Sequence, residues 1–250
     1  MKVIPNLGSL FKIVHIFRRY NFADRVLVDL RAEGDYEKER AFIGKNIHKW
    51  SSDLFKAFNA EVEVRGAENI PEEDGIVFIS NHQSYADVPA LMIAFGERQL
   101  GFIAKEEFQK IPYLGKWITN VRGIYIKRGD PRESLRSIND GAKLIQQGFN
   151  VAIYPEGTRS RGPVMQEFKP GAFKLATKAK AKVVPVVTEG GYHTYEDNGI
   201  MKSGKVIVEF LPAVDTAQLD RKALVALEKQ IEEQIRTRLA EIQAELGVEA

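Results

Sequence analysis

Residues 75–87 read Gly-Ile-Val-Phe-Ile-Ser-Asn-His-Gln-Ser-Tyr-Ala-Asp, so an apolar run gives way within two residues to side chains capable of acid–base chemistry. A short run rich in Ile, Val and Phe, bounded by Gly and polar residues, indicates a buried strand. We therefore expect a strand over residues 75–80 whose carboxyl end leads directly into His82 and Asp87.

From residue 61 onward, the chain alternates between strand and helix patterns. Helical stretches run over residues 131–147 and 170–179, and Gly148 is placed to end the first of them. Strands that alternate with helices predict an α/β fold with a mixed, largely parallel central sheet flanked by helices. The other expected strands cover residues 61–65, 99–104, 123–127, 150–154, 182–187 and 205–211.

A long amphipathic helix is expected near the C-terminus. Its polar face is rich in Glu, Lys and Arg, so we interpret it as a helix that packs along the domain. A short coiled-coil dimer is the alternative, although the heptads are few. The apolar stripe consists of Leu224, Leu227, Ile231, Ile235, Leu239, Ile242 and Leu246.

The first 60 residues are the basic part of the chain. They carry 11 basic and 7 acidic side chains, a net charge of +4, whereas the remaining 190 residues carry −2. Two apolar stripes at helical spacing lie beside Lys and Arg, which is typical of helices in the headgroup layer of an anionic membrane. Ordinary packing against a core is the alternative. The stripes consist of Leu7, Leu10, Phe11, Val14 and Phe17, and of Ile43, Ile47, Trp50, Leu54 and Phe58.

The composition excludes several classes of protein. The 250 residues include no cysteine, which rules out a disulfide framework, a thiolate nucleophile and a thiolate metal site. The overall net charge of +2 argues against a protein that mainly coats nucleic acid. No run approaches the roughly 18 apolar residues of a membrane span. Lys12 and His15 interrupt the apolar run over residues 7–17, unlike a secretory signal. We expect a protein that is soluble or bound to a membrane surface.

Polar side chains follow four of the expected strands. The strand over residues 75–80 leads to His82 and Asp87, and the next two strands lead to Lys105 and to Arg128. The strand over residues 150–154 leads into Pro-Glu-Gly-Thr-Arg-Ser, residues 155–160. Because the carboxyl ends of parallel strands meet at the same edge of a sheet, these groups are expected around one crevice.

His82 and Asp87 are candidates for a catalytic pair. Five residues of continuous helix turn through about 500°, so the side chains can meet only if His82 precedes the helix and Asp87 lies in its first turn. Ser84 is a suitable N-cap, which would make Asp87 the third helical residue and leaves a structural capping box as the alternative. In the catalytic interpretation, Asp87 stabilises the imidazolium, and the other ring nitrogen takes a proton from a substrate hydroxyl.

The sequence offers no partner nucleophile for His82. It contains no Gly-x-Ser-x-Gly, no His-Glu-x-x-His and no phosphate-binding loop of the Walker type. The nucleophile is therefore expected to come from the substrate. Lys105, Arg128 and Arg159 each follow a strand and suit a phosphate monoester. An ion pair between Arg159 and Glu156 is the alternative for that arginine.

These segments resemble the sequence blocks of the glycerolipid acyltransferase family. The first block matches the family's His-x4-Asp signature. The third usually reads Phe-Pro-Glu-Gly-Thr-Arg-Ser and has Tyr154 at its first position here. Four blocks occur in the family's order between roughly residues 75 and 190, and a Phe-Lys-x-Gly element lies between the third and fourth. The blocks cover residues 81–87, 123–128, 154–160 and 183–187, and the additional element covers residues 168–172.

The resemblance implies an enzyme that acylates lysophosphatidic acid to phosphatidic acid. His82, assisted by Asp87, would deprotonate the acceptor's 2-hydroxyl, which would attack an acyl thioester directly, without an acyl-enzyme. Pro185 would shape the pocket of the donor, acyl-CoA or acyl-carrier protein, and the amide of Gly157 is a candidate oxyanion donor. No metal or bound cofactor is implied. The glycerol phosphate would be held by Lys105, Arg128, Glu156, Gly157, Thr158 and Arg159.

The resemblance also gives the N-terminal stripes a purpose. Acyl chains leave a bilayer only at a large cost, about 0.8 kcal/mol per CH₂. We expect residues 1–60 to hold residues 61–250, the catalytic domain, at the cytoplasmic face of the cell membrane, beside an apolar groove that measures the acyl chain. Many members of the family begin with a transmembrane segment, whereas this sequence indicates attachment at the surface.

Two alternatives stay open at the level of the sequence. The acceptor could be glycerol 3-phosphate or a lysolipid with another headgroup, since three cations do not report whether position 1 is already acylated. A non-catalytic protein that binds lysophospholipid at membranes would use the same groove, but it would not need His82 for turnover.

Overall fold

The computed structural model describes residues 7–20, 24–127, 129–169, 173–196, 202–219 and 221–248. Within these ranges the strands form one sheet in the order β1-β7-β6-β2-β5-β3-β4, and β8 pairs with β6 beside this path. The strands are β1 (Ala60–Arg65), β2 (Val77–Ser80), β3 (Gly101–Lys105), β4 (Ile124–Ile126), β5 (Val151–Ile153), β6 (Lys182–Glu189), β7 (Gly204–Phe210) and β8 (Val214–Asp215).

The sheet is mixed and largely parallel, which confirms the expected fold class. β6, β2, β5, β3 and β4 pair in parallel, and β1 pairs in parallel with β7. β7 and β8 are antiparallel to β6. All of the expected strands are present, with ends that differ by one or two residues. β8 was not expected, because two residues are too short to carry a strand pattern.

Helices cover both faces of the sheet. The expected helix over residues 131–147 is present as α6, and Gly148 follows it with a φ of +91°, outside the helical region. The sequence patterns did not indicate α2, α5 or α8. The helices are α1 (Leu7–Tyr20), α2 (Asp24–Glu33), α3 (Tyr36–Ala57), α4 (Asp87–Ala94), α5 (Leu114–Asn120), α6 (Pro131–Gln146), α7 (Lys174–Ala179), α8 (Gly191–Thr194) and α9 (Arg221–Leu246), with 3-10 turns η2 (Ala67–Asn69) and η3 (Glu106–Lys110).

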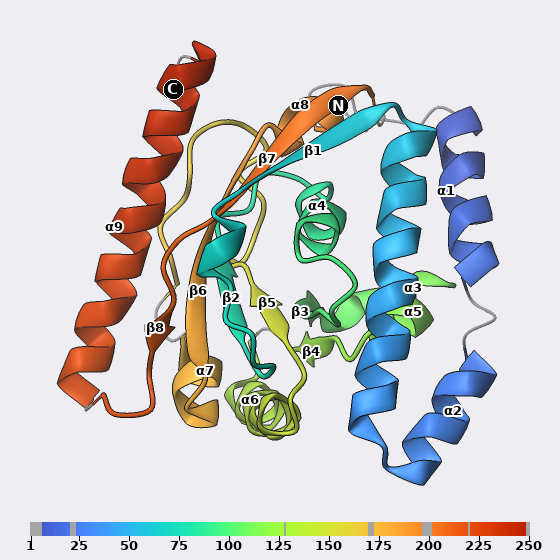
Figure 1. Ribbon diagram of the computed structural model, residues 1–250, viewed down its shortest axis with the longest axis horizontal. Helices are drawn as coiled ribbons and strands as arrows, with labels where there is room; N and C mark the ends of the chain where they lie inside the picture. Colours follow the sequence, from blue (N-terminus) through green and yellow to red (C-terminus); the bar gives the residue numbers. More distant parts are fainter. Residues whose placement is uncertain are drawn as a thin grey trace.

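Side chains alternate along β2, so each face of the sheet has its own core. Ile76 and Phe78 pack on the side of α3, α4 and α5, whereas Val77 and Ile79 face α6, α7 and α9. Figure 1 shows α9 along one side of the sheet and α3 along the other, with α4 between α3 and the strands. The interpretation of α9 as a packing helix is confirmed by its buried stripe, Leu227, Ile231, Ile235, Leu239 and Ile242.

The second N-terminal stripe belongs to the core rather than to a membrane-facing surface. All five of its residues are buried, and Trp50 packs on Trp117 of α5 with ring centroids 4.3 Å apart. The packing alternative is therefore correct for α3, because its apolar face lies against α4 and the sheet. α1 is different, since Phe17 packs on Trp50 but Phe11 is 73% exposed. Within the described residues, no helix is both long and apolar enough to cross a membrane.

A buried carboxylate joins the N-terminal helices to the edge of the sheet. Glu39 on α3 has no solvent exposure and accepts a hydrogen bond from Arg31 of α2 (2.7 Å). Both of its oxygens also accept from Arg122, in the turn before β4 (2.8 and 2.7 Å). Arg31 donates in addition to the main-chain carbonyl of Asn120 (2.9 Å). This ion cluster fixes the orientation of α2 and α3 relative to the sheet.

Candidate active site

The loops that follow β2 and β5 form one structural unit at the carboxyl edge of the sheet. The main-chain N–H of Ser160 donates to the carbonyl of His82 (2.7 Å), and that of Arg161 donates to Gln83 (3.1 Å). β2 and β5 are neighbouring parallel strands, so their carboxyl ends adjoin. The first and third sequence blocks are thus brought together, as the strand pattern predicted.

His82 and Asp87 are in contact, with the geometry that their spacing required. His82 Nδ1 lies 2.8 Å from Asp87 Oδ2, and α4 begins at Asp87 itself. The expectation that Ser84 is the N-cap was wrong, because Ala86 occupies the N-cap position of α4. The Ser84 hydroxyl still accepts from a main-chain N–H, that of Ala86 (3.1 Å), but in the turn before the helix. A turn over Tyr85 and Ala86 separates Ser84 from the helix, so Asp87 is the first helical residue rather than the third.

Main-chain donors compensate the charge of the buried Asp87 carboxylate. Besides the imidazole contact, its Oδ2 accepts from the N–H groups of Gln83 (2.7 Å) and Ser84 (2.8 Å). A capping role accounts for the contact with the Ser84 N–H but not for the contact with His82. The His82 side chain is 14% exposed, so Nε2 is the ring nitrogen left for a substrate to reach.

The ring of Tyr154 lies against the imidazole. The rings of Tyr154 and His82 stack with centroids 4.2 Å apart and 29° between their planes. Burial, followed by the charge of Asp87, raises the pKa of Tyr154 well above its ordinary value, so the phenol is neutral. The stacked ring restricts rotation of His82 away from Asp87.

Glu156 supports the main chain of the site. Its carboxylate accepts from the N–H groups of His82 (2.5 Å) and Gln166 (2.9 Å), and the residue is buried. Burial raises the pKa of Glu156 to about 7, and the two hydrogen bonds oppose that shift. Both oxygens are therefore engaged in holding the loops together, an arrangement that does not leave Glu156 facing a phosphate.

Arg159 is held by two side chains that the motifs did not connect to it. Its Cζ lies 3.4 Å from the ring centre of Tyr85, and its Nη1 lies 2.5 Å from Oε1 of Glu196. The alternative that Arg159 pairs with Glu156 was wrong, because the Glu156 oxygens face main-chain N–H groups. Arg159 lies near His82 and Asp87, since the next residue along the chain hydrogen-bonds to the loop 81–87.

Gly157 and Thr158 form the tight turn before Arg159. The φ of Gly157 is +68°, in the left-handed region that favours glycine, and its N–H donates to the carbonyl of Tyr154 (3.0 Å). That bond engages the amide that was the candidate oxyanion donor. Lys169 crosses this turn so closely that its Nζ would lie 2.9 Å from a Cβ at position 157. Lys169 therefore adds a cation to the turn, while Thr158 is exposed.

Lys105 and Pro185 lie farther from His82 and Asp87. Lys105 ends β3, two strands from β2, which places it about 10 Å to the side. Pro185 is buried in β6 opposite Ile79, about 10 Å along the strand from His82. It lies where the antiparallel partner of β6 changes from β8 to β7, a position that tolerates a missing N–H. Arg128 and residues 170–172 of the Phe-Lys-x-Gly element lie outside the described residues.

The end of β6 anchors the loop 81–87. Asn81 exchanges two hydrogen bonds with the main chain of Thr188, both of 2.8 Å. Gln83 Nε2 donates to Glu189 (2.7 Å), which also accepts from Gln243 of α9 (2.8 Å). Sequence reasoning missed Thr188 and Glu189, because they lie just beyond the fourth block and follow no recognisable motif.

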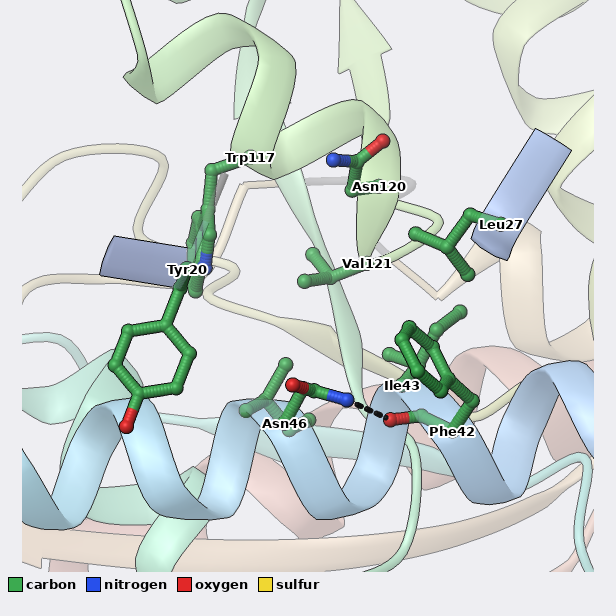
Figure 2. A pocket seen from close by; sticks show the side chains of 9 residues that line it. Tyr20, Leu27, Phe42, Ile43, Asn46, Trp117, Asn120 and Val121 are labelled. Carbon is green, nitrogen blue, oxygen red and sulfur yellow. Dashed lines mark hydrogen bonds between the residues drawn. The ribbon is translucent and has the colours of Figure 1, made fainter. Parts of the chain in front are cut away.

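A small cavity lies between the N-terminal helices and α5 (Figure 2). Its volume is about 30 Å³, which is room for about one water molecule. It cannot hold an acyl chain, so the groove expected to measure that chain stays a prediction. The cavity is lined by Tyr20, Leu27, Phe42, Ile43, Asn46, Ile47, Trp117, Asn120 and Val121.

The segment that contains these blocks matches a known family. Residues 61–189, more than half of the chain, match the family model described as Acyltransferase. The chain belongs to this acyltransferase family. The matched segment runs from β1 to the end of β6 and includes the loops that carry His82, Asp87 and Arg159.

Individual relatives carry more specific names. The chloroplastic 1-acyl-sn-glycerol-3-phosphate acyltransferase of Brassica napus is 36% identical over 132 residues, 52% of this chain and 38% of the relative. The 1-acyl-sn-glycerol-3-phosphate acyltransferase of Borreliella burgdorferi is 27% identical over 183 residues, 73% of each chain. The chain spans less than half of the length of the plant relatives it matches.

The fold of the acyltransferase family is known from a solved relative. The crystal structure of the 1-acyl-sn-glycerophosphate acyltransferase from Thermotoga maritima matches with a TM-score of 0.72 and 27% sequence identity. The match covers 94% of this chain and 98% of the relative, so it includes the flanking helices as well as the sheet.

Proposed function

We propose that this protein transfers an acyl group from an acyl thioester to the 2-hydroxyl of 1-acyl-sn-glycerol 3-phosphate and so forms phosphatidic acid. The observation that carries the proposal is the contact between His82 Nδ1 and Asp87 Oδ2, which leaves His82 Nε2 available at the carboxyl edge of the sheet. The family and the names of the relatives support the choice of reaction and acceptor.

In the proposed reaction, His82 is the general base. Its Nε2 takes the proton of the 2-hydroxyl as the hydroxyl oxygen attacks the thioester carbonyl carbon. The tetrahedral intermediate then collapses with cleavage of the C–S bond, and the leaving thiolate takes the proton back from Nε2. Asp87 stabilises the imidazolium between these steps and holds the proton on Nδ1. An acyl-enzyme is not required, because the nucleophile belongs to the acceptor.

Two further residues act on the position of His82. Tyr154 stacks on its ring, and Glu156 accepts its main-chain N–H. A general base contributes only when its lone pair is aligned with the proton that it removes, so both contacts favour catalysis by limiting rotation. We therefore assign Glu156 to positioning of the base rather than to direct binding of the phosphate.

We assign the phosphate of the acceptor to Arg159, Lys169 and the turn that contains Gly157 and Thr158. A guanidinium and an ammonium beside a glycine turn suit a phosphate monoester, which carries close to two negative charges at neutral pH. Lys105 and Arg128 stay further candidates, for the acceptor or for the phosphates of CoA, because their strands end at the same edge of the sheet.

We further propose that α1 and α2 attach the enzyme peripherally to the cytoplasmic face of the cell membrane. Phe11 on α1 and Val28 on α2 are 73% and 64% exposed, and basic side chains accompany Phe11. Exposed bulky apolar groups beside Lys and Arg favour the interface of an anionic bilayer. Attachment there would spare the acceptor the cost of leaving the bilayer. The basic side chains of α1 are Lys12, Arg18 and Arg19.

Acyl transfer in mixed micelles tests the proposed reaction. The protein is supplied with a long-chain acyl-CoA and, in parallel reactions, with 1-acyl-sn-glycerol 3-phosphate or glycerol 3-phosphate. We expect phosphatidic acid from the first acceptor and no acylated product from the second. Product from glycerol 3-phosphate alone would reassign the acceptor. Binding of lysophosphatidic acid without product from either acyl-CoA or acyl-carrier protein would instead indicate a non-catalytic lipid-binding protein.

A further inference from the structure

We propose that Glu196 competes with the acceptor's phosphate for Arg159 and thereby determines acceptor specificity. The inference rests on the proposed function, because it concerns the arginine assigned to that phosphate. Glu196 lies in the turn after α8, 37 residues from Arg159 along the chain and outside all four sequence blocks. Its role therefore follows from the three-dimensional contact.

The ion pair between Arg159 and Glu196 is short and largely shielded from water. Nη1 of Arg159 lies 2.5 Å from Oε1 of Glu196, and the two side chains are 14% and 8% exposed. Attraction between charges is screened less in such surroundings than between exposed groups. The guanidinium therefore already has a counter-charge that belongs to the protein.

Tyr85 covers one face of the same guanidinium. The Cζ of Arg159 lies 3.4 Å from the Tyr85 ring centre, and Tyr85 meets the ring of Tyr195, next to Glu196, at 5.9 Å. With one face covered and one amino group held, a phosphate on Arg159 must share the guanidinium with the carboxylate or replace it. In both arrangements the negative charge of Glu196 opposes the phosphate.

The ion pair is part of the catalytic edge rather than of a remote surface. The residue after Arg159 hydrogen-bonds to the main chain of the loop 81–87. α8, which leads into Glu196, begins at Gly191, where a Cβ would lie 2.1 Å from Oδ1 of Asp87. Both partners are therefore attached to segments that contact the catalytic pair.

This arrangement favours one class of headgroup. The attraction of a phosphate dianion to the Arg159 guanidinium can offset the weakening of the ion pair with Glu196. A neutral or singly charged group is attracted less strongly and cannot offset it as well. Glu196 would therefore keep acceptors without a phosphate monoester away from Arg159. CoA also carries a phosphate monoester, so acceptor and donor are the two sources of this group that an experiment has to separate.

The substitution Glu196→Gln removes the charge and keeps the size of the side chain. The KM for lysophosphatidic acid and the inhibition constant of inorganic phosphate should both fall about three- to tenfold. The change should fall on KM rather than on kcat, and the KM for acyl-CoA should stay the same. An unchanged or raised KM for lysophosphatidic acid would overturn the proposal, and so would a fall confined to acyl-CoA.

Two controls make the result specific. Glu73→Gln removes the same charge from an ion pair with Lys182 at the opposite edge of the sheet, and it should leave both KM values unchanged. In an Arg159→Ala background, Glu196→Gln should lower the KM much less, because the group for which Glu196 competes is missing and only its repulsion of the phosphate remains. A fall of equal size in that background would overturn the proposal.

Failure of the inference can be told from failure of the proposed function. An active wild-type protein whose KM does not respond to Glu196→Gln would refute the role of Glu196 alone. A wild-type protein that forms no phosphatidic acid would overturn both. Melting temperatures within a few degrees of the wild type verify that the variants compared are folded.

Discussion

Glu39 and Asp87 are both completely buried carboxylates, but their charges are compensated in different ways. Glu39 is held by two guanidinium groups, those of Arg31 and Arg122. Asp87 is held by two main-chain N–H groups and by the imidazole of His82. Arginines stay charged at all relevant pH values, so the Glu39 cluster joins elements permanently. The partner of Asp87 can gain and lose a proton, as general base catalysis requires.

Of the substitutions at the two carboxylates, Asp87→Asn should have the largest effect, and this effect falls on turnover. An asparagine cannot hold the proton on Nδ1 of His82 in the same way or stabilise the imidazolium, so kcat should fall about 10³- to 10⁴-fold. Rates of phosphatidic acid formation at saturating substrates measure this effect. A variant that keeps more than a tenth of wild-type activity would contradict the claim that Asp87 assists His82 in catalysis.

Glu39→Ala should have the largest effect on stability. It leaves two arginine side chains without their shared partner, and the free energy of unfolding should fall by about 3–5 kcal/mol, with kcat retained by the folded protein. Chemical denaturation gives the first quantity. The exposed Glu37 on the same helix is the matched control, and Glu37→Ala should cost less than about 1 kcal/mol. Equal losses from both variants would contradict a structural role for the cluster.

Glu156 is a third buried carboxylate, and it should make the free energy of unfolding depend on pH. Its folded-state pKa of about 7 exceeds its ordinary value, because of burial, so the folded state binds the proton more tightly than the unfolded chain. The unfolding free energy should therefore decrease by about 2–3 kcal/mol as the pH rises from about 4.5 to 7. Denaturation series at several pH values should lose this component in Glu156→Gln. The same pH dependence in both proteins would refute the assignment.

The smallest expected effect concerns membrane attachment. Phe11→Asp removes an exposed apolar side chain and adds a negative charge, so partition onto anionic vesicles should weaken about tenfold. Co-sedimentation with vesicles measures the partition. Val225 on α9 is exposed too, and Val225→Asp should bind as the wild type does. Equal weakening by both substitutions would show that α1 has no special part in attachment.

The features that the sequence predicted depend on local pattern. The spacing of His82 and Asp87 gave the condition for their contact, namely that His82 precedes the helix and Asp87 lies in its first turn. The structure meets this condition. The strands were recognisable as short apolar runs, and their parallel pairing followed from the intervening helices. The N-cap was misplaced, because Ser84 has the right chemistry but lies before an additional turn.

The features that the sequence did not predict depend on distant contacts. Arg159 meets Glu196 only because α8 places the turn after β6 beside the third block. Glu39 lies on an amphipathic helix, where an acidic side chain is normally exposed, and its burial depends on arginines from two other segments. The second N-terminal stripe has the composition of a membrane helix, and the sheet and α4 decide that it is buried.

The central claim is that His82 is the base in acyl transfer to lysophosphatidic acid. The direct measurement compares wild type and His82→Ala at equal folded concentration, with a long-chain acyl-CoA and 1-acyl-sn-glycerol 3-phosphate in mixed micelles. We predict phosphatidic acid from the wild type alone, while the variant still binds the lysolipid. Equal rates of phosphatidic acid formation by the two proteins would contradict the claim.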